Sequence, residues 1–183
     1  MSNQNKGKGR VIWITGLSGA GKSTLAVAIS QQLRKLKNKV ILLDGDQLRS
    51  ILSTVANGTD SYSRIERLSR AMTYSRICRL LADQGFTVVI ATISMFNEIY
   101  AWNRDNLPGY FEIFLNVPIE ELKRRDPKGI YRRFDHGEIS NVAGLDLFVD
   151  EPVKPDLTFD FNPSLTVEYM VKKAVTIILK LGM

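Results

Sequence analysis

The sequence predicts an α/β fold in which helices cover both faces of a parallel β-sheet. Three observations lead to this prediction: short runs rich in Val, Ile and Leu recur along the chain, segments of helical periodicity separate these runs, and a glycine-rich segment directly follows the first run. Runs that are apolar throughout belong to strands that are buried on both faces. Helices between consecutive strands are the usual cover of such a sheet.

Five strands and four helices are predicted in turn along the chain. The strands are expected at Val11–Thr15, Val40–Leu43, Phe86–Thr92, Tyr110–Val117 and Leu157–Phe161. The helices are expected at Lys22–Lys35, Gln47–Leu52, Ser61–Asp83 and Leu165–Lys180. Gly85 follows the third helix, where a C-cap glycine is common. In an open parallel sheet, ligands bind at the carboxyl ends of the strands.

The chain of 183 residues is long enough for one well-buried core and shorter than two ordinary domains. Residues 10–183 are therefore expected to form a single domain. Residues 1–9 are polar and rich in Lys and Gly, which predicts a disordered tail. Residues 123–150 are basic and have the weakest periodicity, which predicts a mobile lid. We see no apolar run that suits a bilayer span or a signal peptide, so we expect a cytoplasmic protein without a membrane partner.

The charge pattern narrows the class of ligand. The formal net charge of +6 suits a nucleic acid or a small anion. Lys and Arg are scattered and form no continuous basic stripe with interleaved aromatic residues, so a small polyanion is favoured over nucleic acid. The single cysteine, Cys78, excludes an internal disulfide and a multi-thiolate metal site. The sequence leaves open whether the chain forms a homodimer.

Residues Gly16–Thr24 match the phosphate-binding pattern G-x-x-x-x-G-K-[ST], with a predicted strand before it and a predicted helix after it. In this context backbone N–H groups surround the phosphates of ATP, Lys22 supplies a positive charge to the β- and γ-phosphates, and the Ser23 hydroxyl ligates Mg²⁺. The predicted ATP-binding residues are Gly16, Ser18, Gly19, Ala20, Gly21, Lys22, Ser23 and Thr24. The pattern predicts the P-loop nucleoside-triphosphate hydrolase fold. A guanine-specific N-K-x-D is missing, because Asn38-Lys39 lacks the aspartate, and a GTPase switch is therefore disfavoured.

Two aspartates, Asp44 and Asp46, follow the second predicted strand. Because this strand end is expected beside the P-loop, both carboxylates are expected to face the γ-phosphate. We assign Asp44 to Mg²⁺ and Asp46 to the acceptor hydroxyl, which it would orient and deprotonate, although the sequence permits the opposite assignment. Arg49 lies one turn into the next helix and is a candidate clamp for an anionic acceptor. The catalytic residues are thus predicted to be Asp46, Lys22 and Asp44, and the metal ligands Ser23 and Asp44.

The motifs around these residues resemble those of the adenylylsulfate kinase family. The resemblance begins with Gly16–Ala26 and Leu43–Arg49. It continues in the same order with Ile93-Ser94, Arg125–Tyr131, Gly137–Ile139, Gly144, Glu151-Pro152 and Pro155, and so extends over nearly all of Val11–Asp156. Members of this family phosphorylate the ribose 3′-hydroxyl of a nucleotide whose 5′-phosphate forms a mixed anhydride with sulfate. The resemblance implies an ATP-dependent kinase of the same reaction type.

The resemblance also implies an acceptor site. By position, this site includes Arg49, Ser94, Phe96, Lys128 and Ile139. Arg67 and Arg70 lie in the segment that replaces the family's acceptor-binding helix, so we expect one of them to touch the substrate; a solvated basic helix face is the alternative. Residues 128–141 would belong to the lid. Within it, Arg132 and Arg133 are candidates for stabilising charge on the transferring phosphoryl group, with a solvated cluster as the alternative.

The acceptor half departs from the family pattern. Gly58–Arg70 replaces the segments that hold the adenosine and the sulfate, Met95 replaces a proline and Ser140 replaces a lysine. Changed contacts predict a changed acceptor, because buried polar groups tuned to one base and one anion reject others. Residues Ala91–Phe96 and Trp102–Arg104 are similar to a divergent branch in capsular phosphoramidate pathways, whose substrate is cytidine diphosphoramidate. We predict this acceptor first and adenylylsulfate second. The rival from another class, an ATP-binding sensor module without acceptor turnover, is disfavoured by the retention of both aspartates.

Overall fold

The computed structural model describes residues 9–53 and 63–181. Within them, five strands form one parallel sheet, as the apolar runs predict. The strands are β1 (Arg10–Thr15), β2 (Val40–Asp44), β3 (Thr87–Ala91), β4 (Phe111–Asn116) and β5 (Leu157–Asp160), in the order β2-β3-β1-β4-β5. Every neighbouring pair is parallel, and Ile12 of β1 lies opposite Val89 of β3 and Phe111 of β4.

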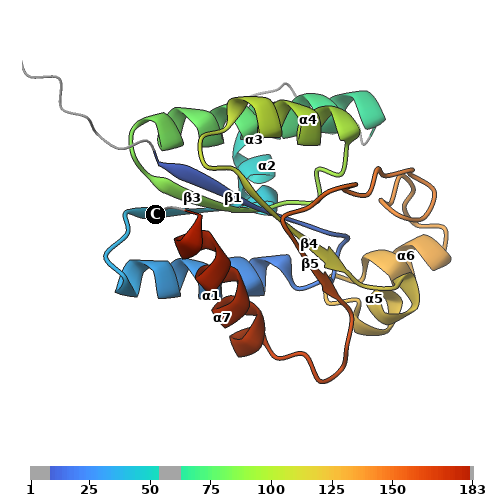
Figure 1. Ribbon diagram of the computed structural model, residues 1–183. Coiled ribbons are helices and arrows are strands. Elements are labelled where there is room, and N and C mark those ends of the chain that lie inside the picture. The colour runs from blue at the N-terminus through green and yellow to red at the C-terminus, as the bar shows by residue number, and fades with distance from the viewer. Residues whose placement is uncertain (1–8, 54–62, 182–183) are drawn as a thin grey trace, which may run out of the picture.

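Helices cover both faces of this sheet (Figure 1). Helices α1 (Lys22–Lys35) and α7 (Val167–Lys180) pack together on one face, and α3 (Arg64–Asp83) and α4 (Asn97–Asn106) cover the other. Helices α2 (Gly45–Ser53), α5 (Ile119–Arg125) and α6 (Ile130–Asp135) lie towards the carboxyl ends of the strands (Figure 1). The short helices therefore gather at the edge where an open parallel sheet binds its ligands.

The side chains of β1 show how the sheet divides the core. Ile12 and Ile14 belong to the apolar cluster beneath α1 and α7, whereas Val11 and Trp13 belong to the cluster beneath α3. All four side chains are fully buried. Because successive side chains of a strand point to opposite faces, a strand covered on both faces must be apolar at every position. This explains why the strand is a continuous apolar run in the sequence.

Local signals mark both ends of α3. The hydroxyl of Ser63, the N-cap residue, accepts a hydrogen bond from the N–H of Glu66 at 3.4 Å. The helix ends at Asp83, and Gly85 follows with a φ of 88°, as expected of a C-cap glycine. The predicted start of this helix at Ser61 lies outside the described residues, as do residues 54–62 as a whole.

Helices α4, α5 and α6 have no counterpart among the predicted helices. Helix α4 buries only Ile99, Tyr100 and Asn103, and this narrow and partly polar stripe gives a weak periodic signal. Helices α5 and α6 are 7 and 6 residues long, which is too short for a test of periodicity. Helix α6 lies within residues 123–150, the weakly periodic segment predicted as a lid, and α5 overlaps its start.

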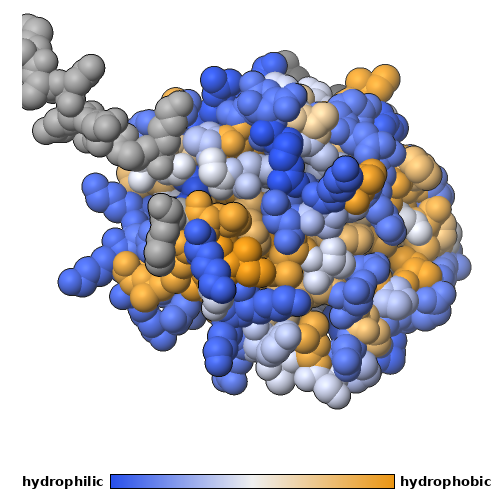
Figure 2. All heavy atoms as spheres, in the orientation of Figure 1, coloured by the Kyte–Doolittle hydropathy of each residue, from blue (hydrophilic) through white to orange (hydrophobic). Residues whose placement is uncertain are grey.

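Gly9 begins the described part of the chain, and its N–H donates a hydrogen bond to the Ala82 carbonyl oxygen at 2.8 Å. We assigned this residue to the disordered tail; the rest of that tail, residues 1–8, lies outside the described residues. Among residues 9–53 and 63–181, no helix combines the length and apolarity needed to cross a bilayer. Figure 2 shows a largely hydrophilic face on which apolar residues gather beside α7.

Candidate active site

The loop between β1 and α1 has the backbone geometry of a phosphate cradle. Gly16, Gly19 and Gly21 have φ angles of 144°, 79° and 97°. Gly21 is the N-cap of α1 and makes no side-chain cap, so the first N–H groups of the helix open towards the loop. A Cβ at Gly16 would lie 2.7 Å from the carbonyl oxygen of Leu115, so this glycine lets the loop pass close to β4.

Lys22 is the first residue of α1, and its side chain turns back into the loop. Its Nζ donates a hydrogen bond to the carbonyl oxygen of Leu17 at 2.7 Å. Burial, followed by repulsion from Lys128, lowers the pKa of Lys22 to about 8, while Asp46 and Asp44 oppose this shift. An anion that arrived beside Lys22 would therefore stabilise its charged form.

The turn after β2 gives its two aspartates different partners. Asp44 ends β2, and its carboxylate accepts hydrogen bonds from the Ser23 hydroxyl at 2.6 Å and from the Asp46 N–H at 2.9 Å. Asp46 lies in the first turn of α2, is exposed, and forms an ion pair with Lys128. Asp44 is thus adjacent to the P-loop serine, whereas Asp46 faces the segment predicted as a lid.

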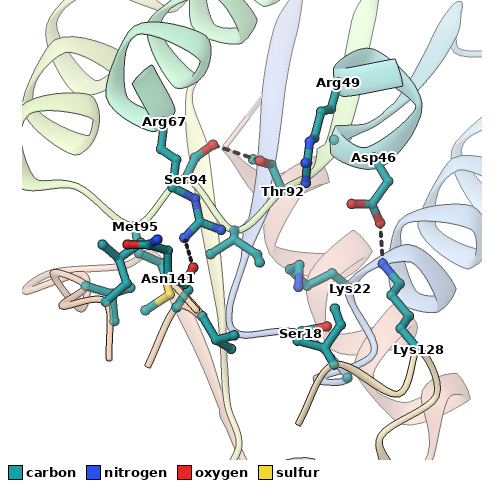
Figure 3. Close-up of a pocket in the computed structure, with 18 of the residues that line it drawn as sticks. Ser18, Lys22, Asp46, Arg49, Arg67, Thr92, Ser94, Met95, Lys128 and Asn141 are labelled. Atoms are coloured by element: carbon teal, nitrogen blue, oxygen red, sulfur yellow. Dashed lines mark hydrogen bonds and ion pairs between the residues drawn. The ribbon is translucent and has the colours of Figure 1, made fainter. Parts of the chain in front are cut away.

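A cleft of about 1080 Å³ extends from the P-loop to α3 and to the segment after β3. The P-loop residues that line it are Ser18, Gly19, Gly21, Lys22, Ser23 and Thr24. The predicted acceptor residues that line it are Arg49, Arg67, Arg70, Ser94, Phe96, Lys128 and Ile139. In Figure 3, Lys22 lies between Arg67 on one side and the Asp46–Lys128 pair on the other. The donor-side and acceptor-side predictions therefore meet in one continuous cavity.

Hydrogen bonds fix the wall of the cleft on the acceptor side. Arg67 Nη1 donates to the carbonyl oxygen of Asn141 at 3.2 Å, which joins α3 to the segment after α6 (Figure 3). Ser94 has a φ of 27°, and its hydroxyl lies 2.7 Å from that of Thr92. Both hydroxyls are buried, so this pair holds the loop that follows β3.

Several predicted site residues do not line the cleft. Gly16 and Ala20 can contact a ligand only through their backbone. Gly16 packs against β4, and the Ala20 side chain is buried in the core. Asp44 is not among the lining residues and contacts the cleft through Ser23, whose hydroxyl donates a hydrogen bond to it. Arg132 is exposed and outside the lining, whereas Arg133 is within it. Neighbouring residues of a helix point about 100° apart, so these two arginines cannot share one direction.

Phe96 lines the cleft but is mostly a core residue. Its side chain is 7% exposed and belongs to the apolar cluster beneath α3. The guanidinium of Arg64 lies 5.2 Å from the centre of its ring, and the same guanidinium pairs with Glu98 and Asp150, each at 3.2 Å. One face of the Phe96 ring is therefore already covered by a protein group.

The second half of the predicted lid packs over the P-loop. The Asp146 carboxylate accepts hydrogen bonds from the N–H groups of Asn141 and Val142 at 2.7 and 2.6 Å. Gly144 has a φ of 83°, and a Cβ at this position would lie 2.7 Å from the side chain of Leu17 in the P-loop. The contact places this segment against the loop; movement of residues 123–150 as a lid stays a prediction.

Two tyrosines make contacts that sequence reasoning missed. The Tyr131 hydroxyl donates to the carbonyl oxygen of Ser18 at 2.9 Å, and the Tyr74 hydroxyl donates to that of Gly45 at 3.1 Å. Burial raises the pKa of each tyrosine to about 12, so both hydroxyls keep their protons at neutral pH. Tyr74 lies seven residues after Arg67, about two helical turns, and so on the same face of α3. This spacing is the sequence signal that could have placed Tyr74 near the site.

A P-loop, a carboxylate pair at the next strand and a cleft lined by cations define a class of protein, the small-molecule P-loop kinases. Comparison with known proteins narrows this class. The sequence profile of the family described as adenylylsulphate kinase matches residues 8–160. The chain belongs to the adenylylsulphate kinase family and is a phosphotransferase that acts on a hydroxyl group.

Relatives in this family differ in the acceptor they are named for. The chain is 40% identical over 167 residues to the cytidine diphosphoramidate kinase of Campylobacter jejuni, which covers 89% of this chain and 95% of that protein. It is 37% identical over 166 residues to the adenylyl-sulfate kinase of Pseudomonas aeruginosa, with coverage of 88% and 83%. The Mycobacterium tuberculosis APS kinase, solved in complex with AMPPNP and APS, matches with a TM-score of 0.84 and 31% identity over 94% of this chain and 98% of that one. This likeness confirms the predicted P-loop fold.

Proposed function

We propose that this kinase transfers the γ-phosphoryl group of ATP to the ribose 3′-hydroxyl of a nucleotide 5′-anhydride, and that the acceptor is cytidine diphosphoramidate. The observation that carries the proposal is the single cleft, in which the P-loop, Asp46 and the arginines of α2 and α3 line one cavity. Donor and acceptor can therefore bind side by side. The similarity to the Campylobacter jejuni kinase, which extends over most of both chains, supports this acceptor.

On the donor side, the N–H groups of the loop and the ammonium of Lys22 would hold the β- and γ-phosphates of ATP. The complex of the Mycobacterium tuberculosis kinase with AMPPNP supports ATP as the donor. The lowered pKa of Lys22 has the same implication, because a buried cation without a strong counter-charge is stabilised when an anion binds. The Tyr131 contact to Ser18 would hold the loop in shape during this exchange.

The donor atoms beside the P-loop fit Mg²⁺. The Ser23 hydroxyl and the Asp44 carboxylate are hard oxygen ligands 2.6 Å apart. Among the described residues no group of three or more His, Cys, Asp or Glu side chains forms a metal cage, which agrees with a site in which phosphate oxygens and water supply most ligands. Bound Mg²⁺ would offset charge on the β- and γ-phosphates.

On the acceptor side, Asp46 would orient the 3′-hydroxyl and take its proton. The hydroxyl oxygen forms a bond to the γ-phosphorus while the bond from that phosphorus to the β,γ-bridging oxygen breaks, so ADP leaves. Lys128 would then exchange its partner: its ammonium group would leave the Asp46 carboxylate and contact the oxygens of the transferring phosphoryl group, where negative charge develops. The anionic 5′-diphosphoramidate would be bound by the cationic guanidinium groups of Arg49, Arg67 and Arg70.

Adenylylsulfate is the second candidate acceptor. The Pseudomonas aeruginosa relative supports it at an identity close to that of the Campylobacter jejuni relative. Both acceptors present the same hydroxyl to Asp46 and differ in the base and in the terminal group. The choice between them therefore depends on the cleft residues that contact the base and the terminal group. The chemistry of phosphoryl transfer is the same for both.

A direct assay tests the proposal. The full chain is incubated with Mg-ATP and, separately, with cytidine diphosphoramidate or adenylylsulfate, and ADP release and ³¹P NMR spectra are recorded. We expect a new phosphomonoester signal with both, and a kcat/KM about 100-fold higher for cytidine diphosphoramidate. A preference for adenylylsulfate would reassign the acceptor, and ATP binding without turnover of either compound would overturn the proposal.

A further inference from the structure

The peptide between the two aspartates is confined by two neighbouring elements. The Tyr74 hydroxyl of α3 donates a hydrogen bond to the carbonyl oxygen of Gly45 at 3.1 Å. At the end of β3, a Cβ added to Gly45 would lie 3.0 Å from Thr92 Oγ1 and 3.1 Å from the Ala91 carbonyl oxygen. The turn thus has a hydrogen bond to one element and a close packing contact with another. Its position depends on both.

Tyr74 belongs to the same helix face as the acceptor-side arginines. Its side chain is 4% exposed, packs into the cluster beneath α3 and also lines the cleft. Arg70 lies about one helical turn before it and Arg67 about two turns before it, and both line the same cleft. One rigid element therefore carries both the cationic wall of the acceptor site and the contact to Gly45.

We propose that Tyr74 is a positioning residue for phosphoryl transfer, whose hydroxyl fixes the Asp46 carboxylate, through Gly45, at a set distance from the arginines that hold the acceptor. This inference rests on the proposed function, because it takes Asp46 as the partner of the acceptor hydroxyl. Along α3 the rise from Arg67 to Tyr74 is about 10 Å, a length on the scale of a nucleotide. The helix acts as a spacer between the anionic end of the acceptor and its reacting hydroxyl.

The proposal separates two kinetic parameters. Tyr74 contacts the aspartate turn at Gly45 and makes none of the contacts described for Lys22, and Asp44 keeps its own hydrogen bond to the P-loop serine, so we expect the loss of the Tyr74 hydroxyl to change ATP binding little. Without the hydroxyl the turn has a wider range of positions, and fewer complexes hold the acceptor hydroxyl in line with the γ-phosphate. The rate of the chemical step falls, whereas the KM for ATP does not rise.

The Tyr74→Phe variant keeps the ring and its packing and removes only the hydroxyl. We expect kcat to fall about tenfold, the effect of one lost hydrogen bond, with the KM for ATP within about twofold of its original value. Thr73→Val is the matched control. The adjacent Thr73 hydroxyl, like that of Tyr74, donates to a backbone carbonyl, but its acceptor is Ser69 within α3 itself, at 3.1 Å. The control variant is expected to keep its kcat.

The Asp46→Asn background tests whether Tyr74 acts through Asp46. If it does, adding Tyr74→Phe to Asp46→Asn slows the residual rate by less than about twofold, because the group being positioned is already gone. A tenfold further loss would overturn the inference, and so would a normal kcat in Tyr74→Phe or a kcat loss that is matched by a lower melting temperature. Each of these results leaves the proposed function standing if Asp46→Asn alone is slow. Full activity of Asp46→Asn would instead remove the proposed role of Asp46.

Discussion

Asp44 and Asp46 are separated by one residue and have opposite surroundings. The Asp44 carboxylate is half-buried and accepts two hydrogen bonds, one of them from the P-loop serine. The Asp46 carboxylate is exposed to the cleft and paired with Lys128. A carboxylate that two hydrogen bonds hold in place still has open lone pairs and is suited to a fixed role near the metal, and a carboxylate that can exchange partners is suited to proton transfer. These contacts support the first of the two assignments that the sequence leaves open.

Substitution of Asp46 tests that assignment. Asp46→Asn keeps the shape of the side chain and removes its basicity, so we expect kcat to fall about 1000-fold while ATP affinity stays near normal. Steady-state kinetics together with equilibrium dialysis of ATP measures both quantities. Asp105→Asn, at an exposed position of α4, is the control and should retain its kcat. Full activity of the Asp46 variant would contradict the assignment.

Substitution of Lys22 tests the phosphate cradle. Lys22→Ala removes the one side-chain cation of the loop, so ATP affinity should fall about 10- to 100-fold and kcat should fall with it. Lys35→Ala removes an exposed charge from the other end of the same helix and should change neither. Isothermal titration with ATP and initial-rate kinetics provide the readout. Unchanged ATP affinity in the Lys22 variant would be incompatible with the cradle.

At the scale of elements, the segment over the P-loop contains two glycines that make a matched pair. Gly144 and Gly137 have φ angles of 83° and 71°, so alanine at either position strains the backbone. Only at Gly144 would the added Cβ meet another side chain, that of Leu17, whereas nothing lies within 4 Å of a Cβ at Gly137. The difference between the two alanine variants therefore isolates the contact between this segment and the P-loop.

We expect both alanine variants to be destabilised by about 1 kcal/mol, which chemical unfolding measures. Only Gly144→Ala should also raise the KM for ATP, because its methyl group displaces Leu17, whose carbonyl oxygen accepts the hydrogen bond from Lys22. Equal KM values in the two variants would show that the segment does not influence the phosphate site.

The elements that the sequence predicts well are those with strong physical signals. Lys22–Lys35 is a helix with the expected bounds, because the glycines before it and the buried face of α1 leave little ambiguity. Each strand differs from prediction by one residue at one or both ends. Helix α4 was missed because its buried face includes the polar Asn103, and Tyr74 was missed because its contact to Gly45 depends on the packing of α3 against α2. Such contacts follow from tertiary structure, and helical spacing indicates only which residues share a face.

At the scale of the whole molecule, an ionic network around the buried Glu112 joins α4 to the start of β4 and to the segment before β5. Arg104 contacts Glu112 at 2.9 Å and Asp156 at 2.8 Å, and the Asp156 carboxylate accepts the N–H of Glu112 at 2.7 Å. Glu112 is 2% exposed, and within the described residues its Oε1 has no hydrogen-bond partner. Burial raises the pKa of Glu112 to about 7, against the opposing effect of Arg104 and with a further rise from Asp156.

This network predicts how stability changes with pH. Between the ordinary Glu pKa of 4.5 and about 7, the folded protein keeps a proton that the unfolded chain releases, so the free energy of unfolding falls as the pH rises. The loss is at most about 3 kcal/mol. Glu112→Gln cannot ionise and should flatten this dependence in thermal melts between pH 5 and 7. Glu120→Gln, at an exposed position of α5, should leave the dependence unchanged. A pH dependence that persists in the Glu112 variant would assign it to another group.

The strand order also sets a width at the carboxyl edge of the sheet. Because β3 separates β1 from β2, two inter-strand spacings, about 10 Å, lie between the strand that leads into the glycines and the strand that leads into the aspartates. Direct neighbours would stand about 5 Å apart and would leave less width at this edge for the γ-phosphate and the acceptor hydroxyl. The intervening strand thus sets the separation between the two motifs. A designer who grafts them onto another scaffold should keep one strand between them.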